Sequence, residues 1–272
     1  MRSETTAAAR MAAAEYFFAI QSLRECHTLR LWEAAENMRT GIMKADGNFD
    51  ELAAALIGRG AYSYGDASAL TTLKESRVRE WFAERTTTKA GSIFRSDYSN
   101  QTKQQLISFL DLVDVYIAGQ LRNEGISLQT LRKVYRSLQH DLGVEHPFGR
   151  HELLTDGRDV FLCGLDSTGR DEVLEVLTKQ KAFPAIIRPF LKSLEFDKAS
   201  RLATKWNIAK GIVVDPKICF GKPIIEAKAI PTYLVAKAVK ANKNNVAAVA
   251  HWYGLTQAQV SSAINFERTR AA

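Results

Sequence analysis

Two features of the sequence predict a mainly α fold with small β-hairpins. Apolar residues recur at helical spacing over residues 62–82 and 231–268, and short apolar runs beside turn-forming residues lie between these stretches. The chain has 272 residues, of which 46% are hydrophobic and 25% charged. A chain of this length and composition can form two or three small domains, each with its own core.

The first segment, residues 1–49, is predicted to be a helical extension. Residues 4–38 contain no glycine or proline and are rich in Ala, Glu, Arg and Leu, which favour helices. A loop at residues 47–49 separates this extension from a short predicted helix over residues 50–57.

A helix-turn-helix is predicted over residues 62–82, inside a second segment that covers residues 50–142. Apolar side chains at helical spacing would bury one side of each helix against the other: Tyr64, Ala67, Leu70, Leu73, Val78 and Trp81. Basic and hydroxyl side chains would then face outward: Lys74, Ser76, Arg77, Arg79 and Arg85. Helix-turn-helix proteins place such a second helix in the major groove, so this pattern predicts binding to double-stranded DNA.

A β-hairpin wing is predicted after these two helices. Residues 86–103 are polar, and short apolar runs at residues 92–94 and 106–108 are read as its strands. Basic side chains in this region are predicted to contact the phosphate backbone of DNA: Lys89, Arg95 and Lys103.

Two capped helices complete the second segment. Ser108 and Asp111 have the spacing of a capping box, which opens a helix that Gly125 ends. Ser127 caps a further helix that runs to about residue 141.

The third segment, residues 143–207, is read as a middle hairpin followed by a helix and a linker. Its strands are predicted at residues 151–154 and 159–163, around an Asp-Gly turn. Residues 197–207 are read as a linker or a short helix.

The last segment, residues 208–268, is predicted to be a small domain of three helices. A strand-like run at residues 212–215 opens it, and three helices follow at residues 231–240, 244–253 and 256–268. Their N-caps are predicted at Asn244 and Thr256, and a C-cap at Gly254. The neighbouring aromatic residues Trp252 and Tyr253 are expected in the core of this domain.

Positive charge is concentrated in this last segment. The net charge is +7; residues 198–272 hold 12 basic and 3 acidic side chains, whereas residues 59–104 hold 8 and 5. Such a basic region favours a phosphate-bearing or acidic partner. Its lysines would contact nucleic acid or a protein, or would only increase solubility: Lys217, Lys222, Lys228, Lys237, Lys240 and Lys243.

The sequence has no motif typical of an enzyme, so we predict no catalytic activity, no cofactor and no metal site. Three cysteines are widely spaced, and His140, His146 and His151 are read as structural histidines. No run approaches the roughly 18 apolar residues of a membrane span, and no signal peptide is apparent. We therefore expect a cytoplasmic protein that does not bind membranes.

Residues 62–82 together with residues 109–134 resemble the winged-helix domain of MerR-type regulators. The second stretch begins Phe-Leu-Asp-Leu-Val-Asp-Val-Tyr-Ile-Ala-Gly-Gln-Leu-Arg-Asn-Glu-Gly-Ile-Ser-Leu, and residues 121–128 are a familiar part of that pattern. Thr72 stands where the turn usually has Gly. The helix after Ser127 is shorter than the coiled coil through which MerR proteins dimerise.

A second resemblance covers the last segment. Residues 213–225 read Val-Val-Asp-Pro-Lys-Ile-Cys-Phe-Gly-Lys-Pro-Ile-Ile, and residues 251–256 read His-Trp-Tyr-Gly-Leu-Thr. Both are similar to a small helical domain family of largely unknown function, whose members often lie beside a PIN-type ribonuclease toxin. At residues 227–229 this chain has Ala-Lys-Ala where that family usually has Gly-Thr-Arg.

The combination of the two regions, over roughly residues 50–268, resembles one type of VapB antitoxin. This resemblance implies an autorepressor that binds operator DNA as a homodimer and neutralises a PIN-type RNase toxin. Lysines would enter the carboxylate-lined, Mg²⁺-holding site of the toxin. We assign this contact to Lys217, Lys222, Lys228, Lys237 and Lys240.

Two alternatives remain open. The first is a MerR-like transcriptional regulator without a toxin partner, which would need a sizeable apolar pocket for its ligand. The second is an interaction module whose helix pair no longer binds DNA. Dimer contacts would come from the N-terminal helix or the middle segment.

Overall fold

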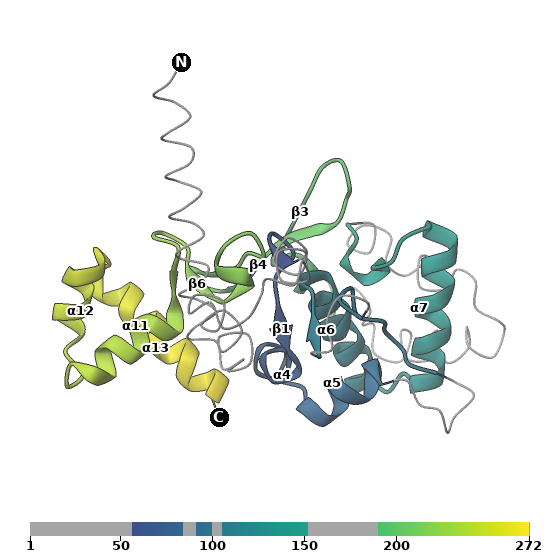
Figure 1. Cartoon of the computed structure of the whole chain (residues 1–272), viewed down its shortest axis with the longest axis horizontal. Helices are drawn as coiled ribbons and strands as arrows, with labels where there is room; N and C mark the ends of the chain where they lie inside the picture. The colour runs from purple at the N-terminus through teal and green to yellow at the C-terminus, as the bar shows by residue number, and fades with distance from the viewer. Residues whose placement is uncertain (1–55, 84–90, 100–104, 152–189, 272) are drawn as a thin grey trace, which may run out of the picture.

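The computed structural model describes residues 56–83, 91–99, 105–151 and 190–271 (Figure 1). The helical extension predicted for residues 1–49 and the hairpin predicted around the Asp-Gly turn lie outside these residues. No helix in the described part of the chain combines the length and apolarity needed to cross a membrane.

The prediction of a mainly α fold with a separate three-helix domain is wrong. The described residues form an α/β fold in which seven helices accompany a two-stranded sheet and a five-stranded antiparallel sheet. The larger sheet joins the two regions that the sequence presents as independent domains.

The N-terminal half begins with the helix-turn-helix and ends with two longer helices. The capping box predicted at Ser108 and the N-cap predicted at Ser127 are present: the Ser108 hydroxyl accepts from Asp111 N–H at 3.1 Å, and the Ser127 hydroxyl accepts from Thr130 N–H at 3.1 Å. The elements are β1 (Tyr62–Ser63), α4 (Tyr64–Thr71), α5 (Glu75–Phe82), β2 (Leu106–Ile107), α6 (Phe109–Asn123), α7 (Leu128–Leu142) and the 3-10 helix η1 (Pro147–Gly149).

The predicted wing is wrong within the described residues. The β2 strand pairs with β1 (62–63), which precedes α4, instead of with residues 92–94. Those residues form no strand, because the N–H groups of Ile93 and Phe94 donate to the carbonyl oxygen of Trp81 at 3.0 and 3.1 Å. Both side chains are buried, so this segment packs on the core instead of extending as a hairpin.

The five-stranded sheet is an antiparallel meander in the strand order β3-β4-β5-β6-β7. The boundary predicted between residues 207 and 208 falls inside β4, which occupies part of the predicted linker. The alternation of apolar and polar residues expected of a strand is not evident in β4, because the pairing register shifts on both sides of this strand. The strands are β3 (Leu194–Phe196), β4 (Ala203–Ala209), β5 (Ile212–Val214), β6 (Ile224–Ile225) and β7 (Ile230–Pro231).

Three helices follow the sheet as predicted: α11 (Thr232–Ala241), α12 (Val246–Tyr253) and α13 (Gln257–Ala271). The N-cap of α12 is Asn245, not Asn244, because Asn244 has a left-handed backbone with φ of 62°. Thr256 caps α13, since its hydroxyl accepts from Gln259 N–H at 3.2 Å. Gly254 ends α12 with φ of 62°.

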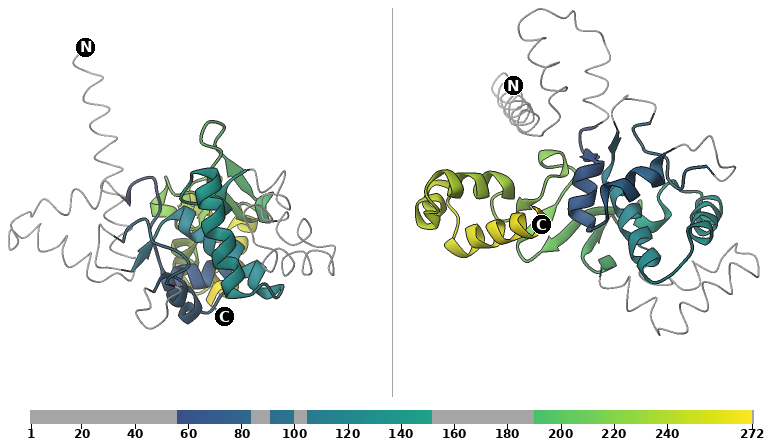
Figure 2. Two further views of the ribbon diagram at one scale, coloured as in Figure 1. Left: turned by 90° about the vertical axis from the view of Figure 1, so that its right-hand side faces the viewer. Right: turned by 90° about the horizontal axis from the view of Figure 1, so that it is seen from below.

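The sheet lies between the C-terminal helices and the helix-turn-helix half (Figure 1). One hydrophobic core joins the helix-turn-helix to the sheet residues Trp206 and Val214. A second, smaller core lies among α11, α12 and α13. Seen from below, α4 lies next to the C-terminal end of α13 (Figure 2), and the two helices are in contact.

Candidate nucleic-acid interface

Local hydrogen bonds fix the two helices of the helix-turn-helix. The Ser63 hydroxyl accepts from Asp66 N–H at 3.1 Å, and the Asp66 carboxylate accepts from Ser63 N–H at 3.1 Å. This capping box starts α4. Thr72 ends the helix with φ of 59°, a left-handed conformation in which glycine is usual. The backbone can then turn into α5.

The apolar faces of both helices are buried as predicted: Tyr64, Ala67, Leu70, Leu73, Val78 and Trp81. The ring of Tyr64 stacks on Phe82 with centroids 5.6 Å apart. The turn packs against α6 at Gly119, where an added Cβ would lie 2.8 Å from the Leu73 side chain. The helix pair is therefore held rigidly on the core.

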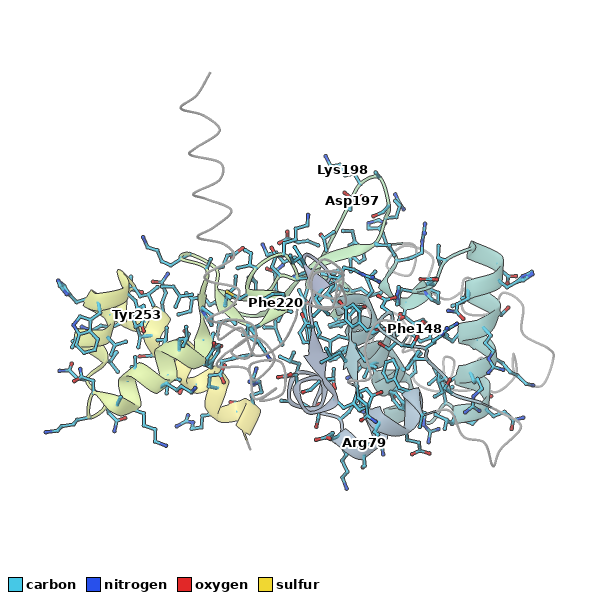
Figure 3. All side chains as sticks on the ribbon, viewed as in Figure 1. Arg79, Phe148, Asp197, Lys198, Phe220 and Tyr253 are labelled. Carbon is cyan, nitrogen blue, oxygen red and sulfur yellow. The ribbon has the colours of Figure 1, made fainter. Side chains whose placement is uncertain are left out.

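The outer surface of α5 is exposed, as predicted for Lys74, Ser76, Arg77 and Arg79. Arg79 donates to the Glu75 carboxylate at 2.6 Å, and its guanidinium lies 5.9 Å from the ring centroid of Tyr64. Figure 3 shows the Arg79 side chain at the lower edge of the molecule. Within the described residues, no ion pair engages Lys74 or Arg77. These two cations are therefore available to a ligand.

The other residues predicted to contact DNA are only partly placed. Arg95 is exposed, and its Nε lies 3.3 Å from the Ser99 hydroxyl. Arg85, Lys89 and Lys103 lie outside the described residues.

Of the lysines assigned to a toxin contact, four are exposed: Lys217, Lys228, Lys237 and Lys240. Lys222 differs, because its ammonium is 3.0 Å from the Asp66 carboxylate and its side chain is only 14% exposed. Burial alone would raise the pKa of Asp66, but the Lys222 ammonium and the hydrogen bonds of Ser63 hold it below its usual range. The side chain of Lys222 thus ties the sheet region to α4.

The neighbouring residues strengthen this junction. Gly221 lies so close to the buried ring of Tyr62 that an added Cβ would be 1.9 Å from the phenol oxygen. Ala61 N–H donates to the carbonyl oxygen of Phe220 at 3.0 Å. The Gly-Lys-Pro run at residues 221–223 therefore docks on the start of the helix-turn-helix. The sequence shows the run but not its partner, since Lys222 and Asp66 are 156 residues apart.

A buried ion network lies behind the helix-turn-helix. The ring of His146 bonds to the carboxylates of Asp114 at 2.8 Å and Asp97 at 3.1 Å, and Tyr135 O–H donates to Asp114 at 2.7 Å. Burial alone would lower the pKa of His146, but the bonds to Asp114 and Asp97 raise it to about 11. Burial raises the pKa of Asp111, beside them, to about 7. His146 is therefore a structural histidine that carries a positive charge.

The same residues could in principle hold a metal ion. Ligand atoms of Asp97, Asp111 and His146 all lie within 4.8 Å of one another. However, a histidine binds a metal ion only through a neutral imidazole. The raised pKa keeps His146 protonated at neutral pH. The arrangement fits an ion network better than a metal centre.

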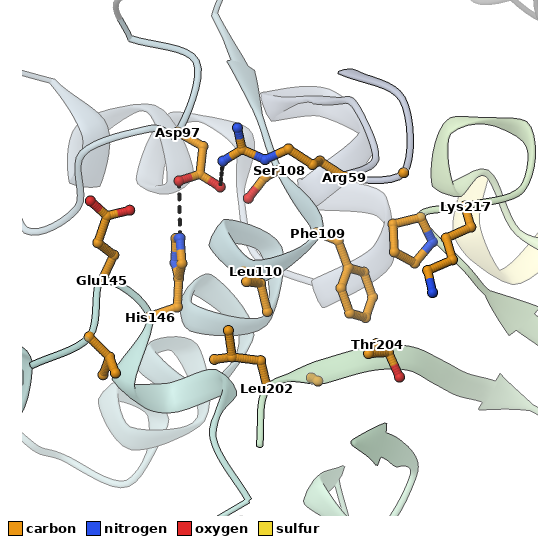
Figure 4. Close-up of a pocket in the computed structure, with 14 residues that line it drawn as sticks. Arg59, Asp97, Ser108, Phe109, Leu110, Glu145, His146, Leu202, Thr204 and Lys217 are labelled. Carbon is orange, nitrogen blue, oxygen red and sulfur yellow. Dashed lines mark hydrogen bonds and ion pairs between the residues drawn. The ribbon is translucent and has the colours of Figure 1, made fainter. Parts of the chain in front are cut away.

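A pocket of about 360 Å³ adjoins this network (Figure 4). It lies between the start of α6 and strand β4, and its apolar wall includes Phe109, Leu110 and Leu202. At one side the Arg59 guanidinium is 2.8 Å from the Asp97 carboxylate, and Lys217 stands at the other (Figure 4). Sequence reasoning missed this pocket because its walls come from six separate stretches of the chain.

Trp252 is not in the core, contrary to the prediction. Its side chain is 62% exposed, whereas Tyr253 packs partly buried against the C-terminal core. The stripe formed by Val246, Val249, Ala250 and Tyr253 already fills the inner face of α12, which turns Trp252 outward.

Comparison with known proteins shows a similar fold in one solved structure and a family match for the C-terminal region. Residues 212–266 match a family described as a protein of unknown function, DUF433. The crystal structure of Rv2018 from Mycobacterium tuberculosis has a similar fold, with a TM-score of 0.58 and 19% sequence identity. That similarity covers 75% of this chain and 96% of Rv2018. No curated protein matches this chain.

Proposed function

We propose that the protein is a DNA-binding antitoxin that represses its own operator and neutralises a PIN-type RNase toxin. The DNA-binding part of this proposal is supported by the exposed face of α5. It presents Lys74, Ser76 and Arg77 from a helix pair whose other face is fixed to the core.

The residues of α5 suit the major groove. A guanidinium such as that of Arg77 bonds in a fork to guanine or to phosphate, and a lysine contacts phosphate as a point charge. The ion pair of Arg79 with Glu75 holds that arginine in place beforehand. One such module binds weakly, so the protein acts as a homodimer on paired half-sites.

The toxin-binding half is supported by the basic C-terminal region and its similarity to the family at residues 212–266. The exposed lysines Lys217, Lys228, Lys237 and Lys240 are free to approach an acidic nuclease site. Lys222 is excluded from this role, because Asp66 holds it at the junction.

The DNA-binding half is tested with the DNA upstream of the gene. Arg77→Ala should weaken binding by about tenfold and reduce the dependence of log affinity on log salt concentration by about one. The control is Lys210→Ala, because Lys210 is also exposed but lies at the turn between β4 and β5. If the unaltered protein shows no salt-dependent binding to this DNA, the repressor half of the proposal is wrong.

The toxin-binding half is tested with the neighbouring gene. We expect it to encode a PIN-type nuclease whose RNA cleavage stops when the purified antitoxin is added at equal concentration. If no such nuclease is encoded there, or if its cleavage continues, the antitoxin proposal is wrong.

One observation favours the second candidate, a MerR-like regulator without a toxin partner. The pocket beside the ion network is large enough for a small molecule, with apolar walls and the cations of Arg59 and Lys217 at its edges. Small carboxylic acids that raise the melting temperature and alter DNA binding would support it. Loss of both effects in Leu202→Trp, which fills the pocket, would identify the site.

A further inference from the structure

The outer face of α12 is unusual for a surface helix because it carries no permanently charged residue. Ala247, His251 and Trp252 are exposed on it, and Ala248 is half-buried. Among the large hydrophobic side chains that the structure describes, only Trp252 and Ile57 are exposed, each by 62%. We call the four residues of α12 the α12 face.

Lysines lie at both ends of the α12 face. Lys240 and Lys243 are exposed just before the helix begins. At its other end, the Cε atom of Lys228 is 3.9 Å from the position of a Cβ on Gly254. The α12 face is thus a neutral strip with a basic rim.

No carboxylate in the three C-terminal helices opposes this rim. Residues 232–271 contain one acidic residue, Glu267. Its carboxylate accepts a hydrogen bond from the Thr232 hydroxyl at 2.5 Å and is 3.7 Å from the Arg270 guanidinium. The potential around the α12 face is therefore positive, which selects an acidic partner.

We propose that the α12 face docks an acidic protein surface, with Trp252 entering an apolar recess and the lysines pairing with carboxylates at its rim. This inference rests on the proposed function, and its partner is the PIN-type nuclease. Tryptophan in a desolvated pocket is a common hot spot of protein interfaces, and charged residues concentrate at their rims.

Two other occupants fit the α12 face less well. A single-stranded nucleic acid would need cations along the whole strip to follow its phosphates, and α12 itself carries none. A second copy of this chain would bring the same lysine rim against its own. Like charges at the rim would oppose that contact.

The test compares two variants that each remove an equally exposed apolar side chain, Trp252→Ala and Ile57→Ala. Binding to the purified neighbouring nuclease is measured by calorimetry, with circular dichroism to check the fold. Trp252→Ala should weaken binding by about thirtyfold, as for a hot-spot residue. Ile57→Ala should change it by less than about twofold.

A second measurement follows Trp252 directly. The other tryptophans are present in both proteins, so the difference in fluorescence between the unaltered protein and Trp252→Phe reports the exposed indole of Trp252. Addition of the nuclease should shift this difference to shorter wavelength. The double variant Lys240→Glu, Lys243→Glu should slow association by about tenfold at low salt, because rim charges steer the encounter.

The outcomes separate the inference from the proposed function. If the unaltered protein does not bind the nuclease, the proposed function fails and this inference with it. If it binds and Trp252→Ala binds equally well, the inference alone is wrong. The inference is also wrong if Trp252→Ala weakens only binding to a poly-dT oligonucleotide, or only self-association on a sizing column.

Discussion

The two larger hydrophobic cores in the described part of the chain are built from different chemistry. The core behind the helix-turn-helix encloses the ion network of Asp97, Asp111, Asp114 and His146. The core of the three C-terminal helices is aliphatic, with Ile225, Val235, Val239, Val249, Ala250, Leu255, Val260 and Ala263. Both cores support a surface that we propose to bind a partner.

The chemistry of each core determines how the surface above it is positioned. Hydrogen bonds and ion pairs are directional, so the network sets the angle at which α6 supports the helix-turn-helix. Aliphatic packing is not directional and only needs to hold α12 on its neighbours. The ionic core consequently depends on pH, whereas the aliphatic core does not.

The largest effect is expected at His146. Replacing it in His146→Leu leaves the Asp114 carboxylate buried beside Asp97 without its cation, which should lower the free energy of unfolding by about 3–5 kcal/mol. The control is His140→Leu, because the His140 side chain is 90% exposed and its loss should change little. Urea unfolding followed by tryptophan fluorescence measures both variants.

The pH dependence of the same site has a definite sign. His146 has a pKa of about 11 when folded and 6.5 as the ordinary value, so its stabilisation is complete below the ordinary value and is lost as pH rises toward 11. From about pH 8 to about pH 10 the free energy of unfolding should fall by about 1.4 kcal/mol per pH unit. This slope should be absent in His146→Leu. An equal slope in both proteins would contradict the charged state of His146.

The next prediction concerns the junction between the two halves. Lys222→Met removes the cation from the part-buried pair with Asp66, at a cost of about 1–2 kcal/mol in the free energy of unfolding. Lys240→Met is the control, because that lysine is exposed. A double-mutant cycle with Asp66→Asn should give a coupling energy of at least about 0.5 kcal/mol.

This experiment also shows whether the two cores unfold together. If Lys222→Met separates the transition of the C-terminal helices from that of the helix-turn-helix, Lys222 couples the two regions. Loss of nuclease binding in Lys222→Met without any loss of stability would instead return Lys222 to the toxin contact first assigned to it.

Structural features that depend on local interactions could be predicted from local patterns in the sequence. The buried faces of α4 and α5 follow from helical spacing, and the capping box at Ser108 and Asp111 follows from a separation of three residues. The exposed positions of Lys74 and Arg77 on α5 were predictable for the same reason. Their contact with DNA stays a prediction.

Contacts between residues that are far apart in the chain could not be predicted from the sequence. His146 pairs with Asp114 across 32 residues and with Asp97 across 49. The strands β6 and β7 have two residues each, too few to show alternation, and only pairing across the sheet defines them. The α/β fold, the ion network and the pocket therefore appear only in the structure.

The smallest effect is expected at the C-terminal ends of two helices, α4 in one half and α12 in the other, which have the same backbone conformation. Thr72 ends α4 with φ of 59°, and Gly254 ends α12 with φ of 62°. A β-branched residue is strained there, whereas glycine is not. Thr72→Gly should raise the free energy of unfolding by about 0.5–1 kcal/mol, the relief of strain exceeding the loss of the bond from its hydroxyl to Thr71.

The reciprocal change, Gly254→Thr, should cost about 1–2 kcal/mol, because no close neighbour blocks the side chain and only the backbone conformation opposes it. Thermal unfolding of both variants gives the two values. If Thr72→Gly destabilises the protein, the hydroxyl bond outweighs the strain. Thr72 would then be a stabilising residue of the turn, and its departure from the usual glycine would carry no energetic penalty.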